Sequence, residues 1–301
     1  MENPTANNTP WDIVDEASYE SFPASDPPGW GSSHATTPVA TPDVAAAGRP
    51  PVVFVATDLD APRCDETLRH ADVEARVRGG KLVVCLVRSV ASNANELAER
   101  ISYVANTTQR DPSTFDVETT MIGRARSIAA RAAALGAELI VVRAPERKRF
   151  AFAGVERVVR HAKCSVLVVR PPYGMNILVA TDLGDDTAQT HAAATRETRI
   201  LDDAPVTTLH CIDSATPTVD AVHRLARLAQ QHRLGAEVSV IAGAPADTIV
   251  NAAYAIGADL VIIATHGRTG LCRMLRPSVA EQVVRRAPGS VLVVRCGAPS
   301  R

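Results

Sequence analysis

Glycine and serine follow an apolar run near the C-terminus, in a pattern typical of anion sites. The run ends at Ala264, Gly267 and Gly270 come next, and Ser278 stands where a helix is predicted to begin. Glycine lets a backbone approach a ligand closely, and the first turn of a helix has unpaired N–H groups and a partial positive charge. The spacing predicts a phosphate-binding loop, although a plain turn between strand and helix uses the same residues.

A second polar pair, Thr181 and Asp182, ends an earlier apolar run. In a parallel sheet with helices between its strands, the carboxyl ends of the strands lie at one edge. Ligands bind there, at the point where the winding direction reverses. We therefore expect Thr181 and Asp182 to lie beside the loop that follows Ala264.

Apolar runs and amphipathic segments alternate through the second half of the chain, and they position these polar residues. Pro245 is predicted to open a helix, where its missing N–H costs nothing, and Gly257 to follow that helix as its cap. The expected strands are 177–181, 206–211, 238–242, 260–264 and 291–295, and the expected helices are 185–201, 219–234, 245–256 and 278–286. This alternation predicts a parallel sheet with helices on both faces.

Three segments recur along the chain. ATDL at 56–59 returns at 180–183, GAELIVV at 136–142 corresponds to GADLVII at 257–263, and SVLVVR at 165–170 returns at 290–295. The offsets are 124, 121 and 125 residues, which indicates a duplicated unit of domain size. We predict two tandem domains, 51–171 and 172–297, each an α/β domain with a doubly wound, five-stranded parallel sheet.

Residues 1–50 differ in composition from the rest. They are rich in Pro, Ser, Thr, Ala and acids, and they lack apolar periodicity, so we predict a disordered tail. Trp11–Phe22 contains aromatic and aliphatic residues and is a candidate docking segment for an unknown protein partner. An inert solvated tail is the simpler alternative.

The composition of the whole chain excludes several classes of function. The chain has 32 basic and 33 acidic residues and no concentrated basic face, so nucleic-acid binding is not expected. No apolar run reaches the ~20 residues of a membrane span, and the start is unlike a secretory signal. The six cysteines lack metal-ligand spacing. We expect a cytoplasmic protein with reduced thiols and no metal site.

The chain resembles the universal stress protein family over about residues 51–295, most strongly in its second half. The segments that carry it are NILVATDLGDD, TTLHCID, AGAPADTIVNAA and ATHGRTGL, with Ser278 downstream. Nucleotide-binding members have a glycine, two residues, a glycine, nine residues, and then a glycine with serine or threonine. Ala264, Gly267, Pro277 and Ser278 stand at that spacing. The resemblance implies a Rossmann-like or flavodoxin-like domain that binds ATP, ADP or AMP, with Mg²⁺ as a companion ion.

The resemblance also implies which residues contact the nucleotide. Asp182 would lie near the adenosine, Cys211 beside the adenine, and Ser278 near the phosphates. The implied set is Ala180, Thr181, Asp182, Cys211, Ile263, Ala264, His266, Gly267, Arg268, Pro277, Ser278 and Val279. The last strands of the two domains would pair edge to edge, 166–169 against 291–294, as an intrachain pseudo-dimer. Whether two chains associate as a homodimer is left open.

Two residues depart from the family's pattern. Ala264 replaces the first glycine and adds a methyl group. Pro277 replaces the last, which removes a backbone N–H and forbids a positive φ. A lost donor to a charged oxygen costs about 1.5–3 kcal/mol, or roughly ten- to a hundredfold in affinity. The N–H groups of Ser278 and Val279 and the charge of Arg268 are expected to compensate.

The first domain is not expected to bind a nucleotide. It keeps Thr57 and Asp58, but the glycine spacing is missing after its fourth strand, where Pro145, Phe150 and Phe152 stand instead. The role of this domain would be to pack against the second.

Catalytic motifs are missing from the sequence. It has no GxSxG, GxxxxGK[ST] or HExxH pattern, and Lys81, Lys148 and Lys163 are its only lysines. His266 is a candidate to orient a water molecule, but a polar loop residue is the simpler interpretation. The sequence thus predicts a nucleotide-binding regulatory stress-response protein without catalytic residues, with a nucleotide-free scaffold and a slow ATPase as alternatives.

Overall fold

The computed structural model describes most of the chain beyond residue 49. The described residues are 50–59, 61, 63–87, 94–118, 125–144, 152–170, 176–184, 187–201, 203–212, 218–232, 234–266 and 278–296. The predicted tail, apart from Pro50, lies outside them. So does the predicted boundary between domains 51–171 and 172–297, which stays a prediction.

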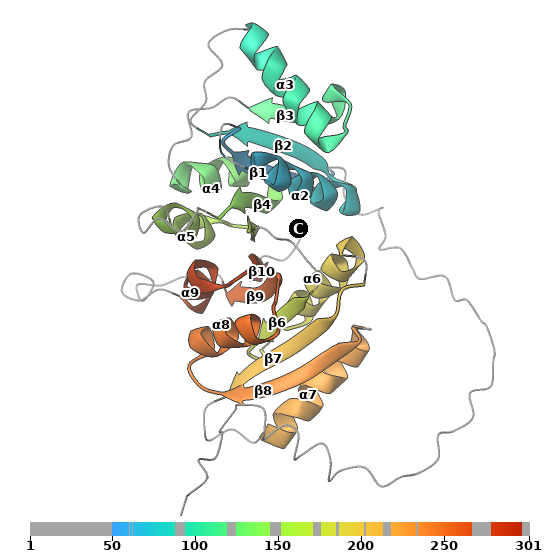
Figure 1. Ribbon diagram of the computed structural model, residues 1–301, viewed down its shortest axis with the longest axis vertical. Helices are drawn as coiled ribbons and strands as arrows, with labels where there is room; N and C mark the ends of the chain where they lie inside the picture. Colours follow the sequence, from blue (N-terminus) through green and yellow to red (C-terminus); the bar gives the residue numbers. More distant parts are fainter. Residues whose placement is uncertain are drawn as a thin grey trace, which may run out of the picture. The chain divides into compact units, whose positions relative to one another are not determined.

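The first half alternates strands with helices. Its elements are β1 (Val52–Thr57), α2 (Cys64–Val77), β2 (Lys81–Leu86), α3 (Ala94–Thr108), the short 3₁₀ helix η1 (Pro112–Thr114), β3 (Phe115–Glu118), α4 (Ala125–Ala134), β4 (Ala137–Arg143), α5 (Phe152–His161) and β5 (Ser165–Val169). The strands lie in the order β3-β2-β1-β4-β5, and all their pairings are parallel (Figure 1).

The second half repeats this arrangement. Its elements are β6 (Ile177–Thr181), α6 (Thr187–Ile200), β7 (Val206–Ile212), α7 (Thr218–Gln231), β8 (Ala236–Ala242), α8 (Pro245–Ala255), β9 (Leu260–His266), α9 (Val279–Arg286) and β10 (Ser290–Cys296). The strand order is β10-β9-β6-β7-β8, again with parallel pairings. The predicted fold class, two tandem doubly wound five-stranded domains, is confirmed.

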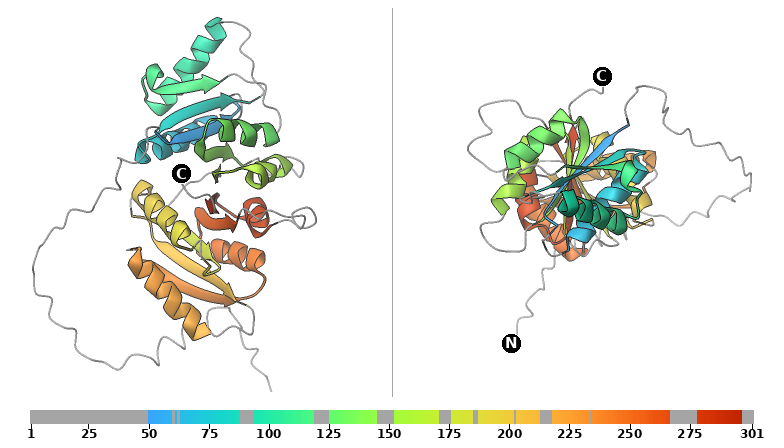
Figure 2. Two further views of the ribbon diagram at one scale, coloured as in Figure 1. Left: turned by 180° about the vertical axis from the view of Figure 1, so that it is seen from behind. Right: turned by 90° about the horizontal axis from the view of Figure 1, so that it is seen from above.

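The two halves share one ten-stranded sheet because their last strands pair. β5 and β10 are antiparallel, with Val168 opposite Val291 and Val166 opposite Val293. The predicted edge-to-edge pairing is therefore confirmed, and Figure 2 shows the two strands side by side in the middle of the sheet. Each apolar edge strand covers the other, so neither is left open to pairing with another molecule.

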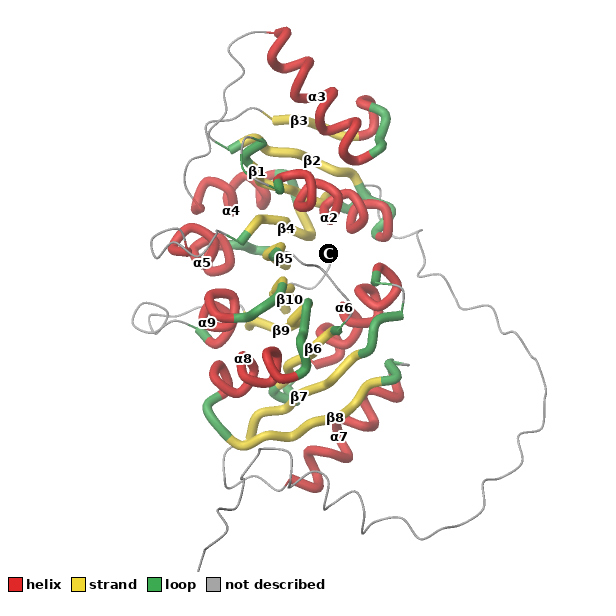
Figure 3. The backbone as a smooth tube through the Cα atoms, viewed as in Figure 1, coloured by secondary structure: helices red, strands yellow, loops and turns green. Residues whose placement is uncertain are grey.

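Helices cover both faces of this sheet. α2, α3, α6 and α7 lie on one face, and α4, α5, α8 and α9 on the other (Figure 3). Successive strand residues point to opposite faces, so Val53 and Val55 pack toward α2, whereas Phe54 and Ala56 pack toward the other layer. Among the described helices, none combines the length and apolar composition that crossing a bilayer requires.

The proline and glycine that were predicted to start and end a helix take those positions in the structure. Pro245 opens α8, and Gly257 follows it in the left-handed region with a φ of +61°. Some boundaries differ near the predicted site, because β9 extends to His266 instead of ending at Ala264, and α9 begins at Val279 and not at Ser278. Ser278 is the N-cap, and its extended backbone lets the side chain accept a hydrogen bond from the helix.

Candidate functional site

Several of the predicted site residues that the structure describes lie at the carboxyl edge of β6 and β9. These two strands are parallel neighbours, with Ala180 opposite Ile263, so Thr181 and Ala264 follow at the same edge. The winding direction reverses here, since β7 and β8 lie to one side and β10 to the other. Such switch points are where doubly wound sheets bind ligands.

Hydrogen bonds fix the turn after β6. The Thr181 hydroxyl accepts from the N–H of Leu183 at 3.0 Å and lies 2.9 Å from the hydroxyl of Thr187, the first residue of α6. Asp182 Oδ1 accepts from the N–H of Gly184 at 2.9 Å, an Asx turn that leaves the carboxylate exposed. Leu183 takes a positive φ of 59°, an unusual conformation for a branched residue that these bonds hold in place.

The end of β7 supplies a histidine and a thiol. His210 is buried, and its Nδ1 lies 2.9 Å from the carbonyl oxygen of Thr181, so this nitrogen carries the proton. Cys211 is half-buried, and burial raises the pKa of its thiol to about 11. The thiol is therefore neutral at physiological pH and presents a small, weakly polar surface instead of a nucleophile.

The turn from β8 into α8 depends on glycine. Gly243 has a φ of +146°, and a Cβ there would lie 2.7 Å from the hydroxyl oxygen of Thr248. The Gly243 N–H donates to the carbonyl of Ile212 at 3.1 Å, which ties this turn to β7. Cys211 Sγ lies 4.0 Å from the carbonyl oxygen of Pro245, so the thiol faces the start of α8.

Ser278 prepares the N-terminus of α9 for an anion. Its hydroxyl oxygen accepts from the N–H of Glu281 at 3.1 Å, and its carbonyl accepts from the N–H of Gln282 at 3.0 Å. The hydroxyl proton is left to donate elsewhere. The N–H groups of Val279 and Ala280, in the first turn, have no acceptor within a helix, so three donors converge at this end.

The structure places most, but not all, of the predicted set. Ala180, Thr181, Asp182, Cys211, Ile263, Ala264, Ser278 and Val279 lie on described elements that share this edge. His266 ends β9, while Gly267, Arg268 and Pro277 lie outside the described residues. Residues 145–151 also lie outside them, so the expectation that the first half binds no nucleotide stays a prediction.

Several residues at this edge were not among those predicted from the sequence. Thr187 contacts the hydroxyl of Thr181, His210 contacts its carbonyl, and Arg224 of α7 donates to the Leu183 carbonyl at 3.0 Å. Because the sequence predicts this helix to begin at residue 185, it does not single out Thr187, the first residue of α6. The described residues contain no group of three or more His, Cys, Asp or Glu side chains arranged to hold a metal ion.

Comparison with known proteins points to one family. Residues 175–295 match the model of the universal stress protein family. Two universal stress proteins of Methanocaldococcus jannaschii are 37% identical over 76 residues and 38% identical over 56 residues. These alignments take in 25% and 19% of this chain and 45% and 35% of the relatives, so the chain spans less than half the length of each.

Solved structures resemble the fold across both halves. A functionally unknown protein from Pseudomonas aeruginosa has a TM-score of 0.64 at 19% identity, with 82% of this chain and 92% of that one covered. A universal stress protein from Archaeoglobus fulgidus has a TM-score of 0.62 at 16% identity, with coverages of 82% and 96%. At these identities the likeness shows the shared two-unit fold.

Proposed function

The second half of this chain belongs to the universal stress protein family, and from that premise we propose that it is an adenine-nucleotide-binding regulatory module. The observation that supports the proposal is that an exposed carboxylate follows β6 and a capped helix N-terminus, that of α9, follows the neighbouring parallel strand β9. A carboxylate suits the hydroxyl groups of a ribose, and a helix N-terminus suits a phosphate.

The available donors and surfaces fit the parts of a nucleotide. The Ser278 hydroxyl and the first N–H groups of α9 would bind the phosphate groups. Asp182 follows β6, the strand next to β9, and would bind the ribose. The neutral Cys211 would lie against the adenine. ATP, ADP and AMP share these parts. With ATP, Mg²⁺ would be held mainly by the phosphate oxygens, as is usual for this ion.

The proposed role is binding and not turnover. Nδ1 of His210 is occupied by the Thr181 carbonyl, and burial keeps the Cys211 thiol protonated. Neither that nitrogen nor the thiol is then ready to accept a proton from an attacking water molecule. A bound nucleotide instead acts by favouring one state of the surface around α9, to the extent that it binds that state more tightly.

The test is a calorimetric titration of the full chain with ATP, ADP and AMP. Asp182→Asn keeps the Asx turn but removes the charge, and it should weaken binding about tenfold or more because a charged hydrogen bond is lost. Asp203→Asn, in the connection before β7, is the matched control and should leave affinity unchanged. Absence of binding by the unmodified chain, or equal affinities of the two variants, would refute the proposal.

A further inference from the structure

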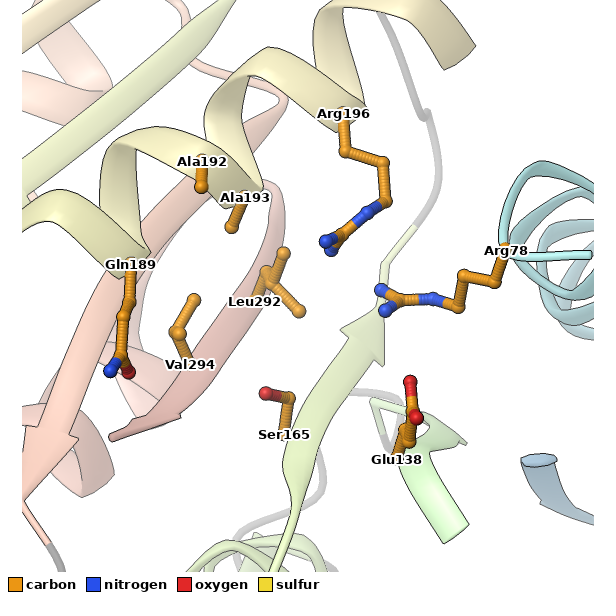
Figure 4. Close-up of a pocket in the computed structure, with 9 residues that line it drawn as sticks. All are labelled: Arg78, Glu138, Ser165, Gln189, Ala192, Ala193, Arg196, Leu292 and Val294. Atoms are coloured by element: carbon orange, nitrogen blue, oxygen red, sulfur yellow. The ribbon is translucent and has the colours of Figure 1, made fainter. Parts of the chain in front are cut away.

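A pocket of about 270 Å³ lies where the two halves meet, on the sheet face covered by α2 and α6. The first half contributes Arg78 and Ser165, and the second contributes Gln189, Arg196 and Leu292 (Figure 4). None of its lining residues belongs to the predicted nucleotide-binding set. The pocket is therefore a separate feature of the molecule.

Two guanidinium groups approach each other over this pocket. Arg78 follows α2, Arg196 lies on α6, and their side chains extend toward one another from opposite sides (Figure 4). Burial lowers the pKa of Arg196, and the positive charge of Arg78 lowers it further. An anion between them would offset the repulsion of like charges and replace the lost hydration.

Nearby carboxyl groups do not satisfy both cations. Glu74 pairs with Arg78 at 3.0 Å, and no such pair is found for Arg196 in the described part of the chain. Burial and then the neighbouring Glu74 raise the pKa of Glu197 well above its usual value, so Glu197 keeps its proton to a higher pH than an ordinary glutamate does. Glu138 also lines the pocket and, like Glu74 and Glu197, acts to raise the pKa of Arg196, but it is exposed, so solvent weakens this effect.

The remaining walls are apolar or neutral. Leu292 and Val294 of β10 form the floor with Ala192 of α6 beside them. The Ser165 hydroxyl accepts from the Arg295 N–H at 3.2 Å, so its proton is available to donate. The volume lies just below the ~300 Å³ at which typical ligand pockets begin, which limits the occupant to a small molecule.

From this geometry we propose that the pocket binds a small organic carboxylate. Its carboxylate group lies between Arg78 and Arg196, and its short apolar body lies against Leu292 and Val294. The ligand contacts both halves of the chain at once, so binding stabilises their junction by mass action. This role is independent of the nucleotide and of the edge where the nucleotide would bind.

The test is a calorimetric titration of the full chain with hexanoate, up to about 10 mM, the range of weak small-ligand binding. Arg196→Gln should weaken binding tenfold or more because a charge-assisted hydrogen bond is lost. Arg199→Gln is the matched control, since it removes one positive charge from an exposed position of the same helix. A flat titration of the unmodified chain, or equal affinities of the two variants, would overturn the proposal.

A second pair of variants tests the pocket by volume. Ala192→Phe places a ring over the floor and should abolish hexanoate binding, whereas Ala188→Phe, at another exposed position of α6, should not. Inorganic phosphate is the second probe and should bind at least tenfold more weakly than hexanoate, because it cannot use the apolar floor. Equal binding of phosphate and hexanoate, or binding that survives Ala192→Phe, would contradict the assigned ligand class.

Discussion

Ser278 connects the candidate site to the junction of the two halves through a single neighbour. Its hydroxyl oxygen accepts from the N–H of Glu281, and the Glu281 carboxylate in turn pairs with Arg160 of α5 in the first half, with Nε and Oε1 3.0 Å apart. A ligand that engages Ser278 therefore acts on the residue that also contacts the other half. This is a physical route by which nucleotide binding would alter the junction.

Substituting Ser278 separates helix capping from nucleotide binding. Ser278→Ala should lower the free energy of unfolding by about 1 kcal/mol, the usual cost of a lost N-cap, and should also weaken nucleotide binding. Ser278→Asp keeps a capping oxygen, so stability should be retained, but its charge should weaken phosphate binding at least tenfold by repulsion. Denaturant unfolding and calorimetry measure the two effects. Unchanged affinity in Ser278→Asp would exclude phosphate from this helix end.

Substitution of Pro277 tests whether nucleotide affinity can be raised. Pro277→Gly restores one backbone N–H immediately before the cap, and nucleotide affinity should rise by roughly tenfold or more if that donor reaches a phosphate oxygen. The control is the same substitution in the Asp182→Asn background, where the gain should persist. Unchanged affinity would mean that the donor lost to proline is not one the ligand uses.

Helices α5 and α9 form a reciprocal contact between the halves. Arg160 pairs with Glu281, and Arg285 pairs with Glu156, with Nε and Oε1 2.6 Å apart. Each residue lies 125 positions from its counterpart, so the two pairs exchange under the internal symmetry, as in an isologous dimer interface. Both carboxylates are largely buried, which makes them sensitive to the loss of a partner.

Breaking one of these pairs should cost stability, and exchanging the charges should restore it. Glu156→Arg places two guanidinium groups together and should lower the free energy of unfolding by about 2–4 kcal/mol. The double variant Glu156→Arg with Arg285→Glu should regain more than half of that loss. Urea unfolding of the single and double variants measures this. Additive effects would show that the pair does not interact in solution.

The elements were largely predictable because each carries its own local pattern. β6 was placed at 177–181 from an apolar run, and the β5–β10 pairing followed from the family resemblance. The start of α9 was misplaced by one residue, because capping depends on where one side chain points. The contacts of His210 and Arg224 could not be predicted, since they depend on how separate strands and helices pack together.

Two equivalent glutamates meet where α2 packs against α6. Glu74 and Glu197 lie 123 residues apart, close to the offsets of the repeated segments, and both are buried with exposed fractions of 2% and 0%. This contact could not be predicted from the sequence, because an isolated glutamate on a helix is usually solvent-exposed. Within the folded molecule the pair makes the junction between the halves sensitive to protonation.

The stability of the whole molecule should therefore fall as pH rises above about 4.5, the ordinary pKa of glutamate. Burial and Glu74 raise the pKa of Glu197 in the folded state, so the folded state binds a proton that the unfolded chain has lost. The stabilisation is complete below pH 4.5 and disappears as pH rises through the folded pKa, with a slope of at most about 1.4 kcal/mol per pH unit per proton.

Glu197→Gln removes this dependence because the amide cannot ionise. The variant should show a flatter pH profile of unfolding than the unmodified chain, whereas the control Glu237→Gln, at an exposed position of β8, should keep the original slope. Denaturant unfolding at several pH values measures both. Parallel profiles for the chain and Glu197→Gln would show that Glu197 binds no extra proton in the folded state.

An adenine nucleotide is proposed to bind at the carboxyl edge of β6 and β9 in the second half. Photolabelling of the full chain with an azido-adenine nucleotide, followed by mapping of the labelled peptide, tests it most directly. Label is expected near Cys211 or the turn at Gly243, and it should be lost on competition with unmodified ATP, ADP or AMP. Label confined to residues 51–171, or label that competition does not remove, would contradict it.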